Sequence, residues 1–213
     1  MSRFHSCAYT VSKNSTRTCY VLKCDVRKFF ASIDHDVLLS ILRKYIPDAD
    51  TFWLLAQIVN SFNSGTEEKG LPLGNLTSQL LVNVYMNEFD QYVKHTLKVK
   101  YYIRYADDFV VLSHEKRNLV ALLSEMKIFL EDTLKLTLHP NKCYIKTFAS
   151  GVDFLGWVHF PSHRVLRTGT KRRMLKVMAS SDPKPEIFAS YLGMLKHGNT
   201  YKLQKQIAKA TSA

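Results

Sequence analysis

The sequence predicts an α+β fold in which helices cover one face of an antiparallel sheet. The first observation is that short apolar runs alternate with segments of helical periodicity, in the order β, α, α, β-turn-β, α, β. The second is size and composition, because 213 residues that are 46% hydrophobic can bury one sizeable core, or a core with a small appended subdomain. The third is a composition shift near Pro161, after which the chain is basic and mostly helical in pattern.

The first third of the chain predicts one strand and two helices. Residues 17–25 ("RTCYVLKCD") are typical of a buried strand, and residues 34–46 of a helix with Asp34 or Asp36 as its N-cap. Residues 51–62 continue as a second helix. The apolar residues expected on one face of the first helix are Val37, Leu38, Ile41, Leu42 and Tyr45.

The middle of the chain predicts a loop, a long helix and a strand pair. Residues 63–75 have the Gly, Pro and charged content of a loop. The elements expected after it are a helix at 78–97 opened by Thr77 or Ser78, strands at 100–105 and 109–113 around the pair of aspartates, and a helix at 115–134. Residues 152–160 predict a further strand or half of a hairpin, and residues 190–207 an amphipathic helix with its turn.

The net charge of +12 is concentrated at the two ends of the chain. Residues 1–30 contain six Lys and Arg against one acidic residue, residues 31–160 contain 13 against 15, and residues 161–213 contain 11 against two. These ranges carry +5, −2 and +9. This polarity favours a polyanion that lies across the basic flanks, where phosphate contacts release counterions. The alternative is that both ends are simply solvated surfaces.

Targeting and redox signals point to a cytoplasmic protein without a membrane partner. No run of roughly 18 apolar residues occurs, and the N-terminus lacks the apolar core of a signal peptide. The cysteines have neither C-x-x-C spacing nor the density of a disulfide scaffold, which favours reduced thiols. His159 and His163 are four residues apart, but Pro161 between them argues against a metal pair on one helix face.

Two adjacent carboxylates, Asp107 and Asp108, lie between the apolar runs of the predicted strand pair. Alone they are more typical of a solvated turn than of a catalytic site. Asp25 changes this interpretation because it ends another apolar strand 82 residues earlier, so three acids at strand ends could meet. Clustered carboxylates suit Mg²⁺, and two such ions about 3.5–4 Å apart can support an in-line phosphoryl displacement. The chemistry predicted is nucleotidyl transfer.

Five segments in order resemble the palm motifs of a bacterial reverse transcriptase: "LKCDVRKFFASIDHDVL", "GLPLGNLTSQLLVNVYMNEFD", "YIRYADDFVVLS", "LTLHPNKCYI" and "DFLGWVHF". The resemblance implies an RNA-directed DNA polymerase with a ferredoxin-like palm at residues 21–160. It also implies a remnant of the fingers at 1–20 and a small, basic, mostly helical thumb start at 161–213. The sequence Gly74-x-x-x-Ser78-Gln79 resembles the variant of diversity-generating retroelements, a lineage related to group II intron and retron enzymes.

The resemblance implies a two-metal site of Mg²⁺, for which Mn²⁺ could substitute. Asp25 and Asp107 would be the principal ligands, Asp108 would support them, and the carbonyl of Val26 would be a further ligand. Lys142 matches a lysine proposed to protonate the departing pyrophosphate, although an exposed lysine is the plainer interpretation.

Several residues are expected to contact the nucleotide and the primer. Phe30 matches the aromatic residue beneath the incoming sugar, where a ring excludes a 2′-hydroxyl and so selects dNTPs; the alternative is that Phe29 and Phe30 both fill the core. Gly70 and Gly74 permit close backbone approach ahead of a helix N-terminus, and Gln79 is expected to contact nucleotide or template unless the segment is an ordinary helix cap. Arg104 and Tyr105 flank the acids and could touch the primer, although Tyr105 could equally be a packed strand residue.

The C-terminal segments are expected to hold an RNA template paired with a DNA or RNA primer. The hairpin resembles a primer grip formed by Leu155, Gly156 and Trp157, in which Gly156 allows close approach of a backbone and Trp157 offers an apolar surface; a plain core hairpin is the alternative. The cations expected on the duplex backbone are Arg164, Arg167, Lys171, Arg172, Arg173 and Lys176.

The main departure from the family pattern is that 24 residues precede Asp25, and none of their cations matches a triphosphate-binding position. The fingers are therefore expected to be largely missing, so that the protein is a truncated form, depends on an accessory chain, or is retained for binding. A non-catalytic RNA-binding scaffold is the alternative function. An RNA-templated RNA polymerase is disfavoured by Phe30.

Overall fold

The computed structural model describes residues 3–62, 68–178 and 185–211. Its contacts divide the chain into two compact units, which we treat separately. The central unit is Tyr20–Ile145, and the terminal unit combines Met1–Cys19 with Lys146–Ala213. The predicted boundary at residue 160 does not coincide with this division, because the hairpin at 152–160 clusters with the terminal residues.

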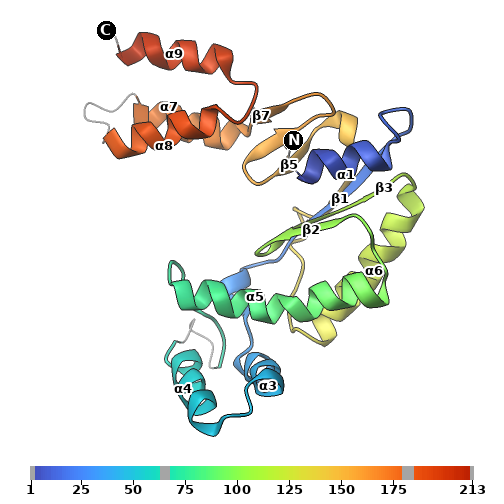
Figure 1. Ribbon diagram of the computed structural model, residues 1–213, viewed down its shortest axis with the longest axis vertical. Coiled ribbons are helices and arrows are strands. Elements are labelled where there is room, and N and C mark those ends of the chain that lie inside the picture. The colour runs from blue at the N-terminus through green and yellow to red at the C-terminus, as the bar shows by residue number, and fades with distance from the viewer. Residues whose placement is uncertain (1–2, 63–67, 179–184, 212–213) are drawn as a thin grey trace. The chain divides into compact units, whose positions relative to one another are not determined.

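The helices and strands of both units can be followed in Figure 1. The central unit comprises β1 (Tyr20–Asp25), α2 (Phe29–Ser32), α3 (His35–Tyr45), α4 (Ala49–Asn60), α5 (Leu76–Gln91), the π-helix η1 (Tyr92–Thr96), β2 (Tyr102–Tyr105), β3 (Asp108–Ser113), α6 (Lys116–Asp132) and the start of β4 (Tyr144–Thr147). The terminal unit comprises α1 (Arg3–Val11), the 3₁₀ helix η2 (Phe148–Ser150), β5 (Val152–Phe154), β6 (Trp157–His159), β7 (Arg164–Leu166), α7 (Thr168–Met178), α8 (Pro185–Leu195) and α9 (Tyr201–Thr211). Among the described residues, no helix has the length and apolar character needed to cross a bilayer.

The terminal unit contains a three-stranded antiparallel sheet in the order β5-β6-β7. Residues 152–160 thus form both strands of a hairpin rather than one strand, and the turn uses Leu155 (φ +52°) and Gly156 (φ +80°). One core cluster of this unit joins Trp157 and Leu166 of the sheet to apolar side chains of the helices, namely Met174, Leu195, Leu203 and Ile207. Strand β7, helix α1 and strand β4 were not predicted from the sequence.

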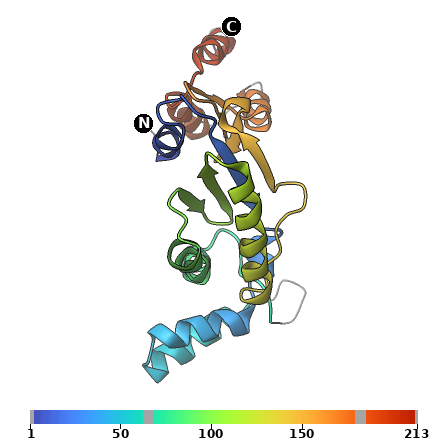
Figure 2. The ribbon, with the colours of Figure 1, turned by 90° about the vertical axis from the view of Figure 1, so that its right-hand side faces the viewer.

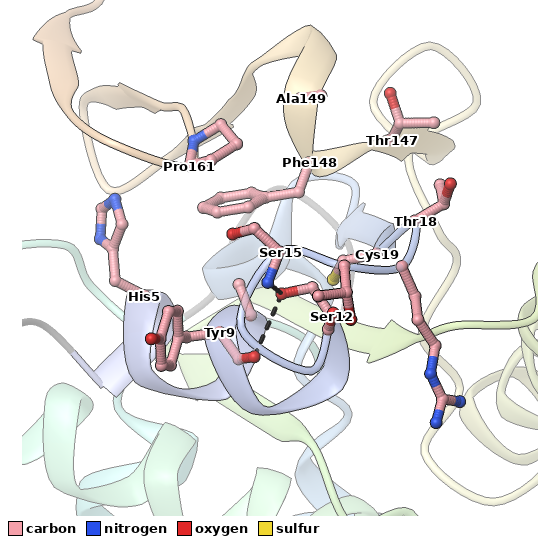
Figure 3. A pocket seen from close by; sticks show the side chains of 13 residues that line it. His5, Tyr9, Ser12, Ser15, Thr18, Cys19, Thr147, Phe148, Ala149 and Pro161 are labelled. Atoms are coloured by element: carbon pink, nitrogen blue, oxygen red, sulfur yellow. Dashed lines mark hydrogen bonds between the residues drawn. The ribbon is translucent and has the colours of Figure 1, made fainter.

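The terminal unit also contains a cavity of about 400 Å³ (Figure 3). His5 and Tyr9 of α1, the hydroxyl-rich loop that follows α1, and Phe148 and Pro161 line it. Ser12 closes the loop, because its hydroxyl donates to the Tyr9 carbonyl and accepts from the Ser15 amide. None of the residues predicted to act in catalysis or binding lines this cavity.

Gly198 provides a test of the packing in the terminal unit. A Cβ atom at this position would lie 2.1 Å from Cζ3 of Trp157 and 3.0 Å from the Arg164 carbonyl oxygen. Because the backbone atom cannot yield, Gly198→Ala is expected to lower the free energy of unfolding by about 2 kcal/mol. Urea denaturation followed by tryptophan fluorescence measures this.

Gly193 is the matched control, since it lies within α8 and a Cβ there would have no heavy atom within 4 Å. Gly193→Ala is expected to raise the free energy of unfolding by about 1 kcal/mol through helix propensity alone. Equal effects of the two substitutions would contradict the packing of Gly198 against Trp157.

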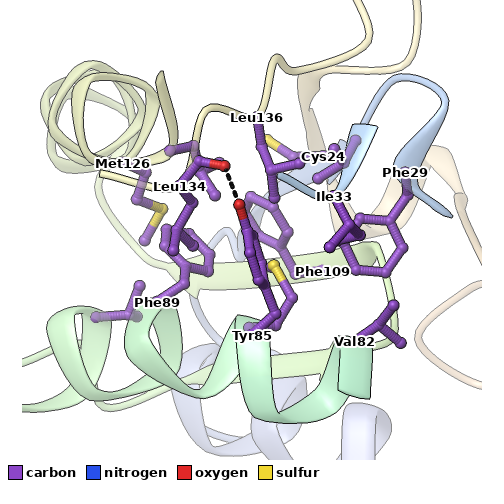
Figure 4. Close-up of a cluster of buried hydrophobic side chains, with 14 of the residues drawn as sticks. Cys24, Phe29, Ile33, Val82, Tyr85, Phe89, Phe109, Met126, Leu134 and Leu136 are labelled. Atoms are coloured by element: carbon purple, nitrogen blue, oxygen red, sulfur yellow. Dashed lines mark hydrogen bonds between the residues drawn. The ribbon is translucent and has the colours of Figure 1, made fainter. Parts of the chain in front are cut away.

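The central unit is built on a sheet in the order β2-β3-β1-β4. Side chains alternate between its faces, so Leu22 and Cys24 of β1 and Phe109 and Val111 of β3 point into one core. Helices α5 and α6 cover this face through Tyr85, Phe89, Met126 and Leu130. Figure 4 shows the Tyr85 hydroxyl among these side chains, where it donates to the Leu134 carbonyl over 2.7 Å. The predicted fold, with helices on one face of an antiparallel sheet, is confirmed.

The helix starts show which sequence signals were correct. Asp34 caps α3 by accepting from the Val37 amide, as one of the two predicted alternatives. Helix α5 is capped by Asn75, which accepts from the Thr77 amide, so the predicted start at Thr77 or Ser78 was wrong. Asn75 was overlooked because it also fits the preceding loop, of which residues 63–67 lie outside the described residues.

Helices α3 and α4 pack side by side in the central unit (Figures 1 and 2). The predicted apolar face of α3 is correct for Leu38, Ile41 and Leu42, which are buried. Tyr45 is exposed, because it lies in the last turn of the helix, and its hydroxyl donates to Glu88. The sequence pattern did not reveal that the core ends one turn before the helix does.

Candidate active site

Pairing of β1 with β3 brings Asp25 and Asp108 together across 83 residues of sequence. They are direct partners in the antiparallel register and end the ladder on each strand. Since Leu22 and Cys24 point to the helices, Asp25 points to the opposite face. Asp107 lies in the turn between β2 and β3, where its carbonyl accepts from the Val26 amide over 3.3 Å. The predicted meeting of the three acidic segments is therefore present in the structure.

Two lysines neutralise part of this acidic cluster. Lys23 Nζ lies 3.2 Å from Asp108 Oδ1 and 3.8 Å from Asp25 Oδ2. Lys142 Nζ lies 3.2 Å from Asp25 Oδ1 and 3.3 Å from its Oδ2. Lys142 reaches Asp25 because the preceding segment runs beside β1, where the His139 amide donates to the Asp25 carbonyl. Asp107 has no ion pair within the part of the chain that the structure describes.

Partial exclusion of water raises the pKa of two of the carboxylates, Asp107 and Asp108. Burial raises the pKa of Asp107, and the nearby negative charge of Asp25 raises it further. Burial also raises the pKa of Asp108 to about 6, against the opposing charge of Lys23. A cation bound beside these carboxylates would favour their ionised form. Carboxylate oxygens are also the donors that Mg²⁺ prefers.

The donor chemistry therefore fits a hard divalent cation, although no ready-made cage is present. Within residues 3–62, 68–178 and 185–211, no three Asp, Glu, His or Cys side chains are grouped closely enough to hold a metal ion. The ammonium groups of Lys23 and Lys142 bind two of the three carboxylates instead. Asp25, Val26 and Asp107 do line one shared cavity of about 370 Å³.

Phe30 lies where this cavity and a neighbouring one of about 400 Å³ share a wall. The second cavity is also lined by Gln79, Arg104 and Tyr105, so four residues predicted to contact nucleotide or primer are brought together. The structure separates the two adjacent phenylalanines: Phe29 is buried in the core, whereas Phe30 is half-buried. Phe30 packs against the core on one side and lines both cavities on the other, so packing accounts for only part of its position.

Residues 2–159 match the family model described as reverse transcriptase (RNA-dependent DNA polymerase). This match covers well over half of the chain. The chain belongs to the reverse transcriptase family. The family predicted from the five sequence motifs is thereby confirmed.

The chain spans about half or less of the length of the curated relatives that it matches. Protein YkfC of Escherichia coli is 28% identical over 204 residues, covering 78% of this chain and 51% of YkfC. The group II intron-encoded protein LtrA of Lactococcus lactis is 22% identical over 240 residues, covering 81% of this chain and 39% of LtrA. A group II intron protein is thus among the relatives, and a finer placement among retroelements stays a prediction.

Solved telomerase structures share the fold. Apo telomerase from Candida tropicalis matches with a TM-score of 0.60 at 10% identity, over 78% of this chain and 39% of that chain. Telomerase from Candida albicans, solved with a fragment of telomeric RNA, matches with a TM-score of 0.60 at 9% identity, over 99% of this chain and 42% of its own. At these identities the likeness concerns architecture alone.

The sequence analysis missed two residues that line the two cavities next to Phe30. Asn83 lies one helical turn after Gln79 on α5 and lines the same cavity, and its amide donates to the Gln79 carbonyl. The i to i+4 spacing could have revealed it. His139 lines the cavity of the acids but gave no signal, because a long-range backbone hydrogen bond places it there. Gly74 (φ +83°) lines neither cavity and gives the loop before α5 its conformation.

Arg104 requires a correction, because its guanidinium is engaged within the protein. Its side chain is only 9% exposed and forms two charge-assisted hydrogen bonds with Asp90 of α5, of 2.8 and 2.7 Å. A third hydrogen bond, of 3.0 Å, goes to the Ala106 carbonyl. Arg104 is therefore bound to its neighbours rather than free for a primer. Tyr105 is 67% exposed, which excludes its interpretation as a packed strand residue.

Trp157 and Arg164 require a similar correction in the terminal unit. Trp157 is 8% exposed and belongs to the core cluster, so the plain interpretation of a core hairpin is correct for this residue. The Arg164 guanidinium lies 4.9 Å from the centre of the Trp157 ring and donates to the His197 carbonyl. Only the turn of the predicted primer grip, with Leu155 exposed, is free to meet a ligand.

The other predicted basic residues fall into two groups. Arg167 is exposed but pairs with Asp153 of β5 at 2.8 Å. The remaining four lie on α7 with exposed side chains and have no ion pair within the described residues: Lys171, Arg172, Arg173 and Lys176. Helix α7 thus carries the available positive charge of the predicted set.

The raised pKa of Asp108 predicts a pH-dependent stability. An aspartate in an unfolded chain titrates near pH 4, so between about pH 4 and 6 the folded protein retains a proton that the unfolded chain has lost. The free energy of unfolding should therefore fall as the pH rises through this window. Because Asp108→Asn removes this titration, the stability of the variant minus that of the wild type is expected to increase from pH 4 to pH 7.

Urea denaturation in metal-free buffer measures this difference. The ion pair with Lys23 forms only as Asp108 ionises, and the net upward shift of the Asp108 pKa already includes its opposing effect. Asp132→Asn makes the same chemical change at an exposed position at the end of α6 and is the control for the substitution itself. A flat difference for Asp108→Asn would contradict the burial of its carboxylate.

Proposed function

We propose that this chain is a polymerase module that transfers deoxynucleotides to a primer paired with an RNA template. The observation that supports this most directly is the register of β1 and β3, which places Asp25 beside Asp108 at the end of the ladder. Asp107 adjoins them at a cavity that also contains Phe30. A nucleotidyl transfer site needs acidic ligands beside a pocket for the nucleotide, and these residues supply both.

In this proposal two divalent cations, Mg²⁺ or Mn²⁺, supply activation of the primer hydroxyl and stabilisation of the leaving oxygen. Asp25 and Asp107 would bind them with the Val26 carbonyl, and Asp108 would hold Lys23 near the site. Lys142 would leave Asp25 as a cation binds and would then be free to give a proton to pyrophosphate. Phe30 would lie against the sugar, while Gln79 and Asn83 would face the base or the template.

We further propose that the central unit acts as the palm and that α7 belongs to the start of the thumb. The four exposed cations of α7 would contact phosphates of the template and primer without recognising their base sequence. The RNA partner of this proposal is consistent with family membership and with the description of LtrA as a group II intron-encoded protein.

A primer extension assay tests the proposal. The wild-type chain is expected to extend oligo(dT) on poly(rA) with dTTP and Mg²⁺, and to stop when EDTA is added. Binding of the same duplex is followed separately by fluorescence anisotropy. Duplex binding without extension in either Mg²⁺ or Mn²⁺ would replace the proposal with the non-catalytic scaffold.

A further inference from the structure

The ion pair between Asp90 and Arg104 connects helix α5 to the turn that bears the acids. Arg104 Nε and Nη2 donate to the two oxygens of Asp90 over 2.8 and 2.7 Å, which is the bidentate geometry that only a guanidinium can form. The remaining nitrogen, Nη1, donates to the Ala106 carbonyl over 3.0 Å and lies 3.4 Å from Asn83 Oδ1. One buried side chain thus joins Asp90, Asn83 and Ala106.

Ala106 has a backbone conformation that needs such support. Its φ of +52° lies in the left-handed region, which residues with a Cβ atom rarely adopt. A conformation of this kind persists when the surrounding structure over-determines it, and it is common at functional turns. Arg104 holds the carbonyl of Ala106, and the Val26 amide holds the carbonyl of the next residue, Asp107. The turn is therefore fixed from both sides immediately before the two acids.

We propose that Asp90 and Arg104 are positioning residues that hold the Ala106 turn, and hence the Asp107 and Asp108 carboxylates, in the geometry that binds the metal ions. The inference rests on the proposed function and deepens it. It also assigns a role to the C-terminal turn of α5, since Asp90 lies in that turn and its carboxylate binds Arg104 of β2. The same guanidinium lies beside Asn83, about two turns before Asp90 on α5, and Asn83 in turn donates to the carbonyl of Gln79, one turn further back.

The plainer role for this pair is to hold α5 against the sheet. The chain offers a control for that role in Tyr102, whose hydroxyl donates to Asp90 Oδ1 over 2.7 Å without touching Ala106. Tyr102→Phe weakens the attachment of the helix to the sheet but leaves the Arg104 contact with the turn intact. Arg104→Lys keeps a positive charge for Asp90 but cannot also reach the Ala106 carbonyl.

The test compares these two variants with the wild type by Mn²⁺ binding, measured by electron paramagnetic resonance on the protein alone, and by primer extension kinetics. Arg104→Lys is expected to weaken Mn²⁺ binding by about tenfold and to lower kcat by roughly ten- to a hundredfold, with KM for dTTP nearly unchanged. Tyr102→Phe is expected to leave Mn²⁺ affinity and kcat within about twofold of wild type, although the loss of its hydrogen bond lowers the melting temperature. Asp90→Asn, which retains hydrogen bonding to Arg104, should give a smaller change in the same direction as Arg104→Lys.

Each outcome decides between the two roles. Equal effects of Arg104→Lys and Tyr102→Phe on Mn²⁺ binding at similar melting temperatures would overturn the positioning role. If Arg104→Lys does not fold, Asp90→Asn makes the same comparison. If Arg104→Lys binds Mn²⁺ more weakly but the wild type never extends a primer, the positioning role is supported and the proposed function is rejected. If the wild type and Arg104→Lys both extend primers and bind Mn²⁺ equally well, the proposed function is supported and the positioning role is rejected. No Mn²⁺ binding by the wild type would reject both.

Discussion

Asp107→Asn is expected to lower the rate of primer extension by roughly a thousandfold. Asp107 is the carboxylate of the three that no lysine binds within the described residues, and it faces the cavity beside Phe30. Loss of a ligand charge there removes about 4 kcal/mol of transition-state stabilisation, since a metal ion contributes several kcal/mol and each 1.36 kcal/mol is a factor of ten. Single-turnover extension of a labelled primer on an RNA template measures the effect.

The matched control is Asp132→Asn, which makes the same chemical change at an exposed position at the end of α6. This variant is expected to keep the wild-type rate. Duplex binding by Asp107→Asn should stay within about twofold of wild type, because sequence-independent affinity comes from contacts between basic side chains and phosphates. A rate for Asp107→Asn within threefold of wild type would remove this residue from the catalytic centre.

Phe30→Ala is expected to reduce the preference for deoxynucleotides over ribonucleotides by roughly a hundredfold, the scale on which a pocket discriminates a single added group. The ring of Phe30 lies between the cavity of the acids and the cavity of Gln79, where a sugar would lie between metal and base. Removal of the ring opens space for a 2′-hydroxyl. The ratio of kcat/KM for dTTP and UTP on poly(rA) measures the preference.

Phe29→Ala separates selectivity from packing. Phe29 contacts Phe30 edge to face, with ring centroids 5.5 Å apart, but is buried in the central core. Its loss is expected to lower the free energy of unfolding by about 3–5 kcal/mol without changing the nucleotide preference. An unchanged preference in Phe30→Ala would count against the sugar-selecting role. Equal use of both nucleotides by the wild type would favour an RNA-templated RNA polymerase.

The three clustered acids could be found from the sequence because each one lies where a run of apolar residues begins or ends. A strand end is a local property, since alternation and termination are encoded by neighbouring residues. The family motifs then related Asp25 to Asp107 and Asp108, and the register of β1 and β3 agrees with that relation. Phe30 and Gln79 were found in the same way, through their spacing from Asp25 and from Gly74.

The fate of the basic and aromatic residues could not be predicted in this way. Arg104 and Arg164 have the same sequence signature as the exposed cations of α7, yet Asp90 binds one and the His197 carbonyl and the Trp157 ring bind the other. Asp90 lies 14 residues from Arg104, and His197 lies 33 residues from Arg164. Trp157 reaches Arg164 from the neighbouring strand. Charge and spacing reveal that a cation is present, but they do not reveal a distant acceptor that removes it from the surface.

The sequence by itself determined the main helices and strands of the central unit, the α+β class, the family and the acids beside the apolar runs, because local periodicity and motif spacing carry that information. It did not predict helix α1 or strands β4 and β7. The tertiary structure alone decided that Lys23 and Lys142 neutralise the acids, that Arg104 fixes the Ala106 turn, and that Trp157 is a core residue. It also decided the division of the chain at β4. The physical reason is that burial and long-range pairing depend on which surfaces meet after folding, and a single residue type is compatible with either outcome.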